Sequence, residues 1–441
     1  MASKLTLDPL TFFNLKTMSS PTILLLGTCD TKLAELLYTK EHLEHCNGTV
    51  LLMDIGRNPT THPEITITHH DILNAPENQH KHPAKIHTLE RAEYIAALTP
   101  CATNTVAHLH QTRRIHAVLG VGGSCGTALA TALMRDALPV GFPKLMVSTM
   151  ASGDVAPYIG ETDIAMMYSV VDIAGRNRVL ERVLRNAAGA IAGMARVYSE
   201  PAVSSHDRDS GGVVQIGVTM FGVTTPAVTA ARKHLESIIP NCEVYVFHAT
   251  GSGGRAMERL VSEGQLDAVL DLTTTEIVDE VVGGVLSAGP SRLCAASMRD
   301  IPRVVSVGAC DMVNFGTPES VPAKFSEGQR VLHRHNPTVT VMRTTKEECV
   351  QTAQLIAKNL VGEKKGAGQT KVLLPTGGVS MLDTPGQPFW DADADEVLFS
   401  TLESELSGSG ISVQRDSRHI NDPGFAAAAA ELLRDLIEGS H

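Results

Sequence analysis

The chain alternates apolar, strand-like runs with helix-like segments, and four of the strand-like runs end in turns rich in Gly, Ser and Thr. The four turns are GTCDTK (Gly27 to Lys32), GVGGSCGT (Gly120 to Thr127), TMFGVTTP (Thr219 to Pro226) and HATGSGGR (His248 to Arg255). Such a turn makes an anion site. The first N–H groups of the following helix lack internal partners, the helix dipole is positive there, and glycine lets a phosphate approach the backbone. The repetition predicts a protein that holds phosphorylated ligands.

The order of these segments also indicates the fold class. Continuous apolar strands separated by helices are typical of parallel sheets covered on both faces. The alternation runs twice, and a polar stretch, EPAVSSHDRDSGG at 200–212, separates the two runs. We predict an N-terminal extension at 1–20 and two Rossmann-like α/β domains, residues 21–200 and 213–441, joined by a linker at 201–212. Ligands in such sheets bind beyond the carboxyl ends of the strands, where all four turns are expected.

Composition excludes several classes of protein. A length of 441 residues exceeds one ordinary core. An aromatic content of 4% and a net charge of −11 disfavour a nucleic-acid partner. The eight cysteines form no CxxC pair, which excludes a zinc ribbon and gives no disulfide framework. No apolar run approaches the ~20 residues that span a bilayer, and the N-terminus lacks the features of a signal peptide. We therefore expect a cytoplasmic protein with no membrane partner.

The second turn carries the sharpest signal in the first half. GVGGSCGT lacks the lysine of a Walker A loop, and Cys125 stands where a GxGxxG motif needs its third glycine. The turn still offers several N–H groups and two hydroxyls, although a packing turn between helix and sheet would look similar. The cofactor-binding candidates here are Gly122, Gly123, Ser124, Gly126 and Thr127.

The first turn adds further candidates for the same ligand. Thr28, Asp30 and Thr31 are placed to cap a helix, and Lys32 supplies a cation that could meet a phosphate. Asp54 ends the next predicted strand, where an acidic residue often holds a ribose hydroxyl.

The second half contains the candidates for catalysis. His248 and Arg255 flank the fourth turn, and these residue types serve as an acid or base and as a phosphate or carboxylate clamp. Three acids are predicted at strand ends as general bases or metal ligands, against helix capping as the alternative: Asp271, Glu276 and Asp311.

A group of histidines in the first half is predicted to be a solvated loop without a metal. Their spacing fits no helix face, and no cysteine accompanies them. The six are His62, His69, His70, His80, His82 and His87.

Taken together, these motifs resemble the Tm-1-like ATP-binding family. The resemblance rests on GVTMFGVTTP, VFHATGSGGRAME, LDLTTTE, SVGACDMVNFG and HNPTVTVMRTT in the second half, and on GTCDTK, GVGGSCGT, VSTMASGD and SVVDIAG in the first. It covers residues from about 21 to the C-terminus. It implies two Rossmann-like subdomains, a homodimer, and ATP contacts on the Thr28 to Lys32 turn, the Gly122 to Thr127 loop and the turn at Ser152 and Gly153. Plant members carry a further C-terminal barrel domain, so a separately encoded barrel partner is also implied.

Three functional hypotheses follow. The first is an ATP-binding protein that uses ATP, with Mg²⁺, on a small substrate held between its two domains. The second is an NAD-dependent oxidoreductase, because a GGS turn also resembles the cofactor loop of iron-dependent alcohol dehydrogenases. The third is a non-catalytic module whose partner surface is gated by a nucleotide.

Overall fold

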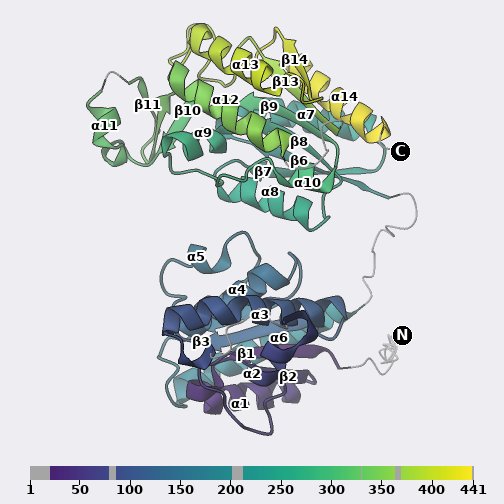
Figure 1. Ribbon diagram of the computed structural model, residues 1–441, viewed down its shortest axis with the longest axis vertical. Coiled ribbons are helices and arrows are strands. Elements are labelled where there is room, and N and C mark those ends of the chain that lie inside the picture. The colour runs from purple at the N-terminus through teal and green to yellow at the C-terminus, as the bar shows by residue number, and fades with distance from the viewer. Residues whose placement is uncertain (1–19, 79–85, 201–211, 329, 363–368, 440–441) are drawn as a thin grey trace, which may run out of the picture. The chain divides into compact units, whose positions relative to one another are not determined.

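The computed structural model describes residues 20–78, 86–200, 212–328, 330–362 and 369–439 (Figure 1). The chain divides into two compact units, Met1–Val203 (unit 1) and Ser204–His441 (unit 2), which are described separately. Each unit has a parallel sheet flanked by helices, so the predicted fold class is confirmed. The predicted extension and linker lie outside the described residues, apart from Ser20 and Gly212.

Unit 1 contains a five-stranded sheet in the order β2-β1-β3-β4-β5, and all of its pairings are parallel. The strands are β1 (Thr22–Gly27), β2 (Thr49–Asp54), β3 (Ala117–Gly122), β4 (Lys144–Ser148) and β5 (Ala165–Tyr168). The helices are α1 (Cys29–His45), α2 (His69–Asn74), α3 (Arg91–Gln111), α4 (Ser124–Ala137), α5 (Ala156–Ile159) and α6 (Arg178–Ser199), with short 3₁₀ turns at Pro76–Asn78 and Ile86–Thr88.

The apolar run of β1 serves both faces of this sheet because successive side chains of a strand point to opposite sides. Leu24 and Leu26 belong to the core cluster that includes α3 and α4. Ile23 and Leu25 belong to the cluster that includes α1 and α6. A strand buried on both faces has no polar side to show, which is why TILLLG reads as a continuous apolar run.

The strand order places a switch point between β1 and β3. The chain passes from β1 to β2 on one side of the sheet and then returns to add β3, β4 and β5 on the other side. The turns after β1 and β3 are the first and second Gly-rich turns, and they lie next to each other at the carboxyl ends of paired strands. In open α/β sheets this is where ligands bind.

Unit 2 repeats this topology with a sixth strand, in the order β14-β13-β9-β8-β6-β7, again with parallel pairings. Its strands are β6 (Val214–Met220), β7 (Cys242–His248), β8 (Ala268–Thr273), β9 (Arg303–Gly308), β13 (Thr370–Pro375) and β14 (Ser412–Asp416). Its helices are α7 (Thr225–Ile238), α8 (Ser252–Ser262), α9 (Thr275–Val282), α10 (Ala295–Arg299), α11 (Ala323–Ser326), α12 (Lys346–Val361), α13 (Ala392–Leu406) and α14 (Pro423–Gly439), with 3₁₀ turns at Gly222–Thr224 and Pro318–Ser320.

Two features differ from, or add to, the sequence prediction. A small antiparallel sheet of unit 2, in the order β10-β12-β11, is formed by Met312–Phe315, Val339–Arg343 and Leu332–Asn336 and was not predicted. The prediction of a solvated loop was wrong for His69, which begins α2 and is 3% exposed. Its Nε2 lies 3.4 Å from the Tyr94 hydroxyl. This tertiary contact keeps His69 buried although the surrounding segment is polar in sequence.

No helix among the described residues is long and apolar enough to cross a membrane.

Candidate functional site

A pocket of about 270 Å³ opens at the switch point of unit 1. It is bounded by the turn after β1, the segment after β2, the first part of α3 and the start of α4. Its lining residues are Thr28, Asp30, Thr31, Lys32, Ile55, Arg57, Tyr94, Ile95, Gly123, Ser124, Cys125, Gly126 and Leu129. The two Gly-rich turns of unit 1 therefore meet at one concave site, as their positions in the sheet require.

The start of α4 presents free backbone donors to this pocket. Gly123 is its N-cap and makes no side-chain capping bond, and Thr127 N donates to Gly123 O at 2.7 Å. No described residue accepts from the N–H groups of Ser124, Cys125 or Gly126. Gly122 is needed for the tight turn, because a Cβ there would lie 2.9 Å from Gly126 Cα. An uncapped helix start of this kind favours an anion.

The start of α1 differs, because a carboxylate of the protein already binds there. Asp54 Oδ1 accepts from Cys29 N at 3.0 Å and from Gly56 N at 2.9 Å. Asp54 is 1% exposed and does not line the pocket. Asp54 lies at the end of β2, as predicted. Its bonds to the backbone of the turns after β1 and β2 indicate that it holds these turns together.

Three charged side chains belong to the lining of the pocket. The Lys32 ammonium donates to the carbonyl of Ile173, and Arg57 Nη2 donates to Leu89 O at 2.7 Å. Lys32 has a non-helical backbone (φ −135°, ψ 25°) within α1. Asp30 is the one acid among the lining residues, and its Oδ2 accepts from Asn58 N at 3.1 Å. The lining thus carries two cations and one carboxylate.

The rest of the lining is apolar: Ile55, Tyr94, Ile95 and Leu129. The Tyr94 hydroxyl donates to Gly56 O, and burial is the main cause that raises the pKa of Tyr94. This hydroxyl therefore stays protonated and holds the segment after β2 in place. The pocket has one polar side and one apolar side.

A seven-residue segment after β5, Ser169 to Gly175 (the strap), is tied to α1 beside the pocket. The Glu35 carboxylate accepts from Gly175 N at 2.6 Å, and Ile173 holds Lys32. Val170 lies at the centre of a γ-turn closed by Val171 N donating to Ser169 O at 2.8 Å, with φ +67°. This conformation is rare and strained for a β-branched residue.

The pocket brings together seven of the twelve cofactor-binding candidates. Those in the lining are Thr28, Asp30, Thr31, Lys32, Gly123, Ser124 and Gly126, whereas Asp54, Gly122, Thr127, Ser152 and Gly153 are not. The Thr127 hydroxyl instead bonds Ser148 Oγ at 2.6 Å. Sequence reasoning missed Arg57 and Tyr94. Arg57 lies three residues beyond a strand end, which is a weak signal, and nothing in the sequence near Tyr94 marks it.

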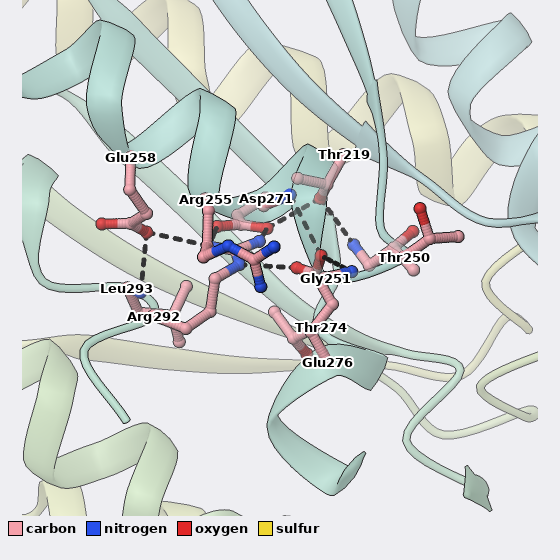
Figure 2. Close-up of polar contacts among 12 residues, drawn as sticks. Thr219, Thr250, Gly251, Arg255, Glu258, Asp271, Thr274, Glu276, Arg292 and Leu293 are labelled. Atoms are coloured by element: carbon pink, nitrogen blue, oxygen red, sulfur yellow. Dashed lines mark hydrogen bonds and ion pairs between the residues drawn. The ribbon is translucent and has the colours of Figure 1, made fainter. Parts of the chain in front are cut away.

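The catalytic candidates of unit 2 lie partly in a buried charge network (Figure 2). Arg292 donates to both oxygens of Asp271 at 2.6 Å each and to Glu276 Oε2 at 2.8 Å. It also bonds Glu258 Oε1 at 3.0 Å. Arg292 was not predicted, because nothing near it in the sequence marks an ion-pair partner for β8 or α9.

Glu276 binds the fourth Gly-rich turn. Its Oε1 accepts from Gly251 N at 2.7 Å and from Gly254 N at 3.0 Å, at the start of α8. Burial raises the pKa of Glu276, and Arg292 opposes that rise. The carboxylate stands where a phosphate would bind, so in this conformation the turn holds the protein's own anion.

The third Gly-rich turn is also satisfied internally. Phe221 N donates to Thr224 Oγ1 at 3.0 Å, and Ala227 N donates to Asn421 Oδ1 at 3.2 Å. Pro226 has no N–H to offer. Of the four helix starts, α4 is the one whose first-turn amides have no side-chain acceptor among the described residues.

Asp311 belongs to a separate buried cluster in unit 2. Its Oδ2 accepts from Ser380 Oγ at 2.8 Å, and Arg343 pairs with Asp395 at 2.5 Å and with Asp383 at 3.8 Å. Burial raises the pKa of Asp311 to about 7 and that of Asp395 to about 8, and the charge of Asp383 adds to both shifts.

The two remaining candidates lie near the exposed side of unit 2. His248 ends β7 with its ring stacked on Phe221 at 5.6 Å between centroids. Arg255 Nη1 donates to Ser287 O at 3.0 Å. Asp271, Glu276 and Asp311 are each at most 1% exposed, which argues against direct contact with a substrate in this conformation.

Comparison with known proteins identifies the family of this chain and several of its relatives. The N-terminal domain model of the uncharacterised protein family UPF0261 matches residues 21–200, and its C-terminal domain model matches residues 214–437. The UPF0261 protein of Clostridium tetani is 41% identical over 418 residues, 94% of this chain and 99% of that protein. That of Rhizobium meliloti is 44% identical over 419 residues, 94% and 98% of the two chains.

A plant relative extends beyond this chain. The ToMV resistance protein Tm-1 of Solanum lycopersicum is 38% identical over 432 residues, which is 95% of this chain and 56% of the tomato protein. A solved UDP-N-acetylglucosamine 2-epimerase covers 65% of this chain and 78% of its own at 12% identity, but its TM-score of 0.18 carries no inference. The Tm-1 proteins are therefore homologues, and the chain belongs to the uncharacterised protein family UPF0261.

Proposed function

We propose that this protein binds ATP, or a closely related nucleotide polyphosphate, in the pocket of unit 1. One observation carries the proposal: the free N–H groups of Ser124, Cys125 and Gly126 open into the same pocket as Lys32 and Arg57. Backbone amides and a helix dipole favour a phosphate, and two cations offset further negative charge. The family resemblance implies ATP contacts on the same two turns.

The lining suggests how the nucleotide would lie. A phosphate would accept from the first turn of α4, and the Lys32 ammonium would exchange the Ile173 carbonyl for a phosphate oxygen. Asp30 is the carboxylate in reach for a Mg²⁺ ion, which is bound in nucleotide sites through one or two carboxylates and substrate phosphates. A volume of about 270 Å³ is just below that of most small-molecule sites, so part of the nucleotide would lie outside the pocket.

The test exploits the position of Ser124 as the first residue of α4. Proline is well accepted at this position but has no N–H, so Ser124→Pro removes a donor while the helix keeps its start. Ser124→Ala, the control, removes only the hydroxyl. Calorimetric titration with Mg-ATP should show a loss of about tenfold or more in affinity for Ser124→Pro, as expected for a hydrogen bond to a charged group. Ser124→Ala should show a smaller loss.

Two results would overturn the proposal. One is the absence of ATP binding to the wild-type chain, and the other is equal affinity for ATP in both variants and the wild type. Tight binding of NAD⁺ with no competition from ATP would favour the oxidoreductase hypothesis instead.

The burial of Asp271, Glu276 and Asp311 favours a second candidate, a nucleotide-gated binding module without catalysis. Both oxygens of Asp271 and of Glu276 already have partners in the protein, whereas Asp311 has a partner among the described residues on Oδ2 alone and is wholly buried. A steady-state assay of phosphate release distinguishes an ATP-using enzyme from a binding module without catalysis. Turnover that survives alanine at all three positions contradicts a catalytic role for them, and no turnover with intact ATP binding supports the module.

A further inference from the structure

Helix α6 presents a basic side to solvent, and we propose that this side docks an acidic helix of a partner protein. The helix contains four arginines and one glutamate, in a chain whose net charge is −11. All four arginines are exposed, and the side of α6 that carries them is here named the arginine face. They are Arg178, Arg182, Arg185 and Arg196.

The four arginines lie along one line of the helix surface. At 3.6 residues per turn, Arg178 and Arg196 are about five turns and about 27 Å apart, so they point the same way. Arg182 and Arg185 deviate from that direction by about 40° or less. The opposite side of α6 carries its buried apolar residues, which belong to the core cluster shared with α1. The arginine face is therefore the side of α6 that the fold of unit 1 leaves exposed.

None of these arginines has an ion-pair or side-chain hydrogen-bond partner among the described residues. Four residues after Arg178, Arg182 and Arg185 the sequence has Arg, Asn and Gly instead of an acid. The one glutamate of the helix, Glu181, is bound by Arg176 at 2.9 Å. Three helices of unit 2, by contrast, pair an arginine with a glutamate at this spacing: Arg232–Glu236, Arg259–Glu263 and Arg434–Glu438. Four aligned cations without an internal carboxylate fit a partner that brings its own.

The middle of the arginine face is flat. Gly189 and Gly193 lie there, and a Cβ at either position would meet nothing within 4 Å. The packing of unit 1 therefore does not require these glycines, although glycine is poorly suited to a helix interior. Val179 and Val197, beside the arginines, are 44% and 69% exposed and again about five turns apart. A flat centre flanked by apolar and cationic side chains suits a second helix, because small residues let two helix axes approach closely.

The chemistry of this face favours a protein helix over a membrane or a single-stranded nucleic acid. A helix at a membrane surface inserts a broad apolar side, whereas the apolar side of α6 is already packed in the core. Single-stranded nucleic acids stack their bases on aromatic side chains, and the arginines, glycines and valines of this face offer none. Guanidinium groups instead bind carboxylates in a bidentate geometry, and arginine is enriched at protein interfaces. A partner helix of about 18 residues would span the face.

The first test measures the binding of a synthetic helical peptide to the full chain by fluorescence anisotropy. The probe has about 18 residues, with glutamates along one side and alanines elsewhere. The wild type should bind it, and the affinity should fall as salt is added. Arg182→Glu combined with Arg185→Glu should weaken binding about tenfold or more. The control, Arg113→Glu with Arg114→Glu, makes the same change in net charge at two exposed arginines after α3 and should leave the affinity unchanged.

A second variant tests shape and not charge. Gly189→Leu adds a bulky side chain to the flat centre without a clash in unit 1, so it should keep the wild-type circular dichroism and weaken peptide binding about tenfold or more. Wild-type affinity in Gly189→Leu would show attraction by charge alone and would overturn the proposal. So would a wild type that does not bind the peptide, or one that prefers anionic vesicles or an oligonucleotide. An oligomer that dissociates in the Arg182→Glu, Arg185→Glu variant would assign the face to a second copy instead.

Discussion

Asp271 and Arg292 meet in a bidentate ion pair with both N···O distances at 2.6 Å, and each residue is 1% exposed. Asp271 is therefore bound on both oxygens by the protein itself, and Thr219 Oγ1 donates to it as well at 2.7 Å. The pair links β8 to the segment before α10 and, through Glu276, to the start of α8. These contacts indicate a structural role at the centre of unit 2.

Replacing Arg292 by Met should destabilise unit 2 by about 3–5 kcal/mol, because Asp271 and Glu276 would remain buried without their cation. The single tryptophan, Trp390, lies in unit 2, so its fluorescence in urea reports this unit alone. Arg255→Met, at the partly exposed fourth turn, is the control and should change stability by about 0.5 kcal/mol or less. A small effect at Arg292 would contradict the network's role.

A methyl group at Gly254 should also break this network. A Cβ there would lie 2.0 Å from Glu276 Oε2 and 2.6 Å from Arg292 Nε, so Gly254→Ala must displace a buried ion pair. We expect a loss of about 3 kcal/mol or more in the same urea titration. Gly222→Ala, where a Cβ meets nothing within 4 Å, should be close to neutral. Equal free energies of unfolding for the two alanine variants would contradict this explanation.

The acids around Arg343 predict that unit 2 loses stability as the pH rises. Their folded pKa values are raised, to about 7 for Asp311 and about 8 for Asp395. Between the unfolded pKa of about 4 and these values the native state binds more protons, so stability falls with rising pH and the loss is complete above about pH 8. Asp395→Asn should reduce this slope in urea midpoints, and Asp393→Asn, at a side chain of the same helix that is 81% exposed, is the control for the substitution itself. A wild-type midpoint that rises with pH would refute the assignment.

Val170 offers a test of backbone strain in unit 1. The positive φ of Val170 costs about 1–2 kcal/mol, and glycine removes this strain. Glycine also costs about 0.5–1 kcal/mol in chain entropy on folding, so Val170→Gly should leave the stability unchanged or raise it slightly. Val179→Gly, at a position in α6 that is 44% exposed against 57% for Val170, should be destabilising. Amide hydrogen exchange of peptides from unit 1 measures both. Destabilisation by Val170→Gly would show that the valine side chain has contacts that outweigh the strain.

Much of the fold could be predicted from local pattern. Runs such as TILLLG and VVQIGVTM are largely apolar at successive positions, as expected for strands that are covered by helices on both faces of a sheet. The Gly-rich turns follow these strands as predicted. β10 to β12 were missed because each has only four or five residues and because HNPTVTVMRTT, which holds β12 and the end of β11, mixes polar and apolar residues although β12 is largely buried.

The sequence could not show whether the first N–H groups of each helix already have an acceptor within the protein. GVGGSCGT and HATGSGGR have the same local signature, yet Glu276 from α9 binds the second, whereas no described side chain binds the first. The partner comes from a segment about 25 residues away, and only the tertiary structure shows which carboxylate reaches which turn. The same applies to Asp54 at α1 and Asn421 at α7.

The bond between Lys32 and the Ile173 carbonyl makes the strap an internal competitor of the proposed ligand. In the proposed binding mode the Lys32 ammonium exchanges that carbonyl for a phosphate oxygen, so the nucleotide affinity would include the cost of releasing the strap. Any change that fixes the strap to α1 would weaken nucleotide binding without touching the pocket, and any change that loosens it would strengthen binding. Under the proposed function, the seven residues beyond β5 would therefore influence the affinity of the pocket for its nucleotide.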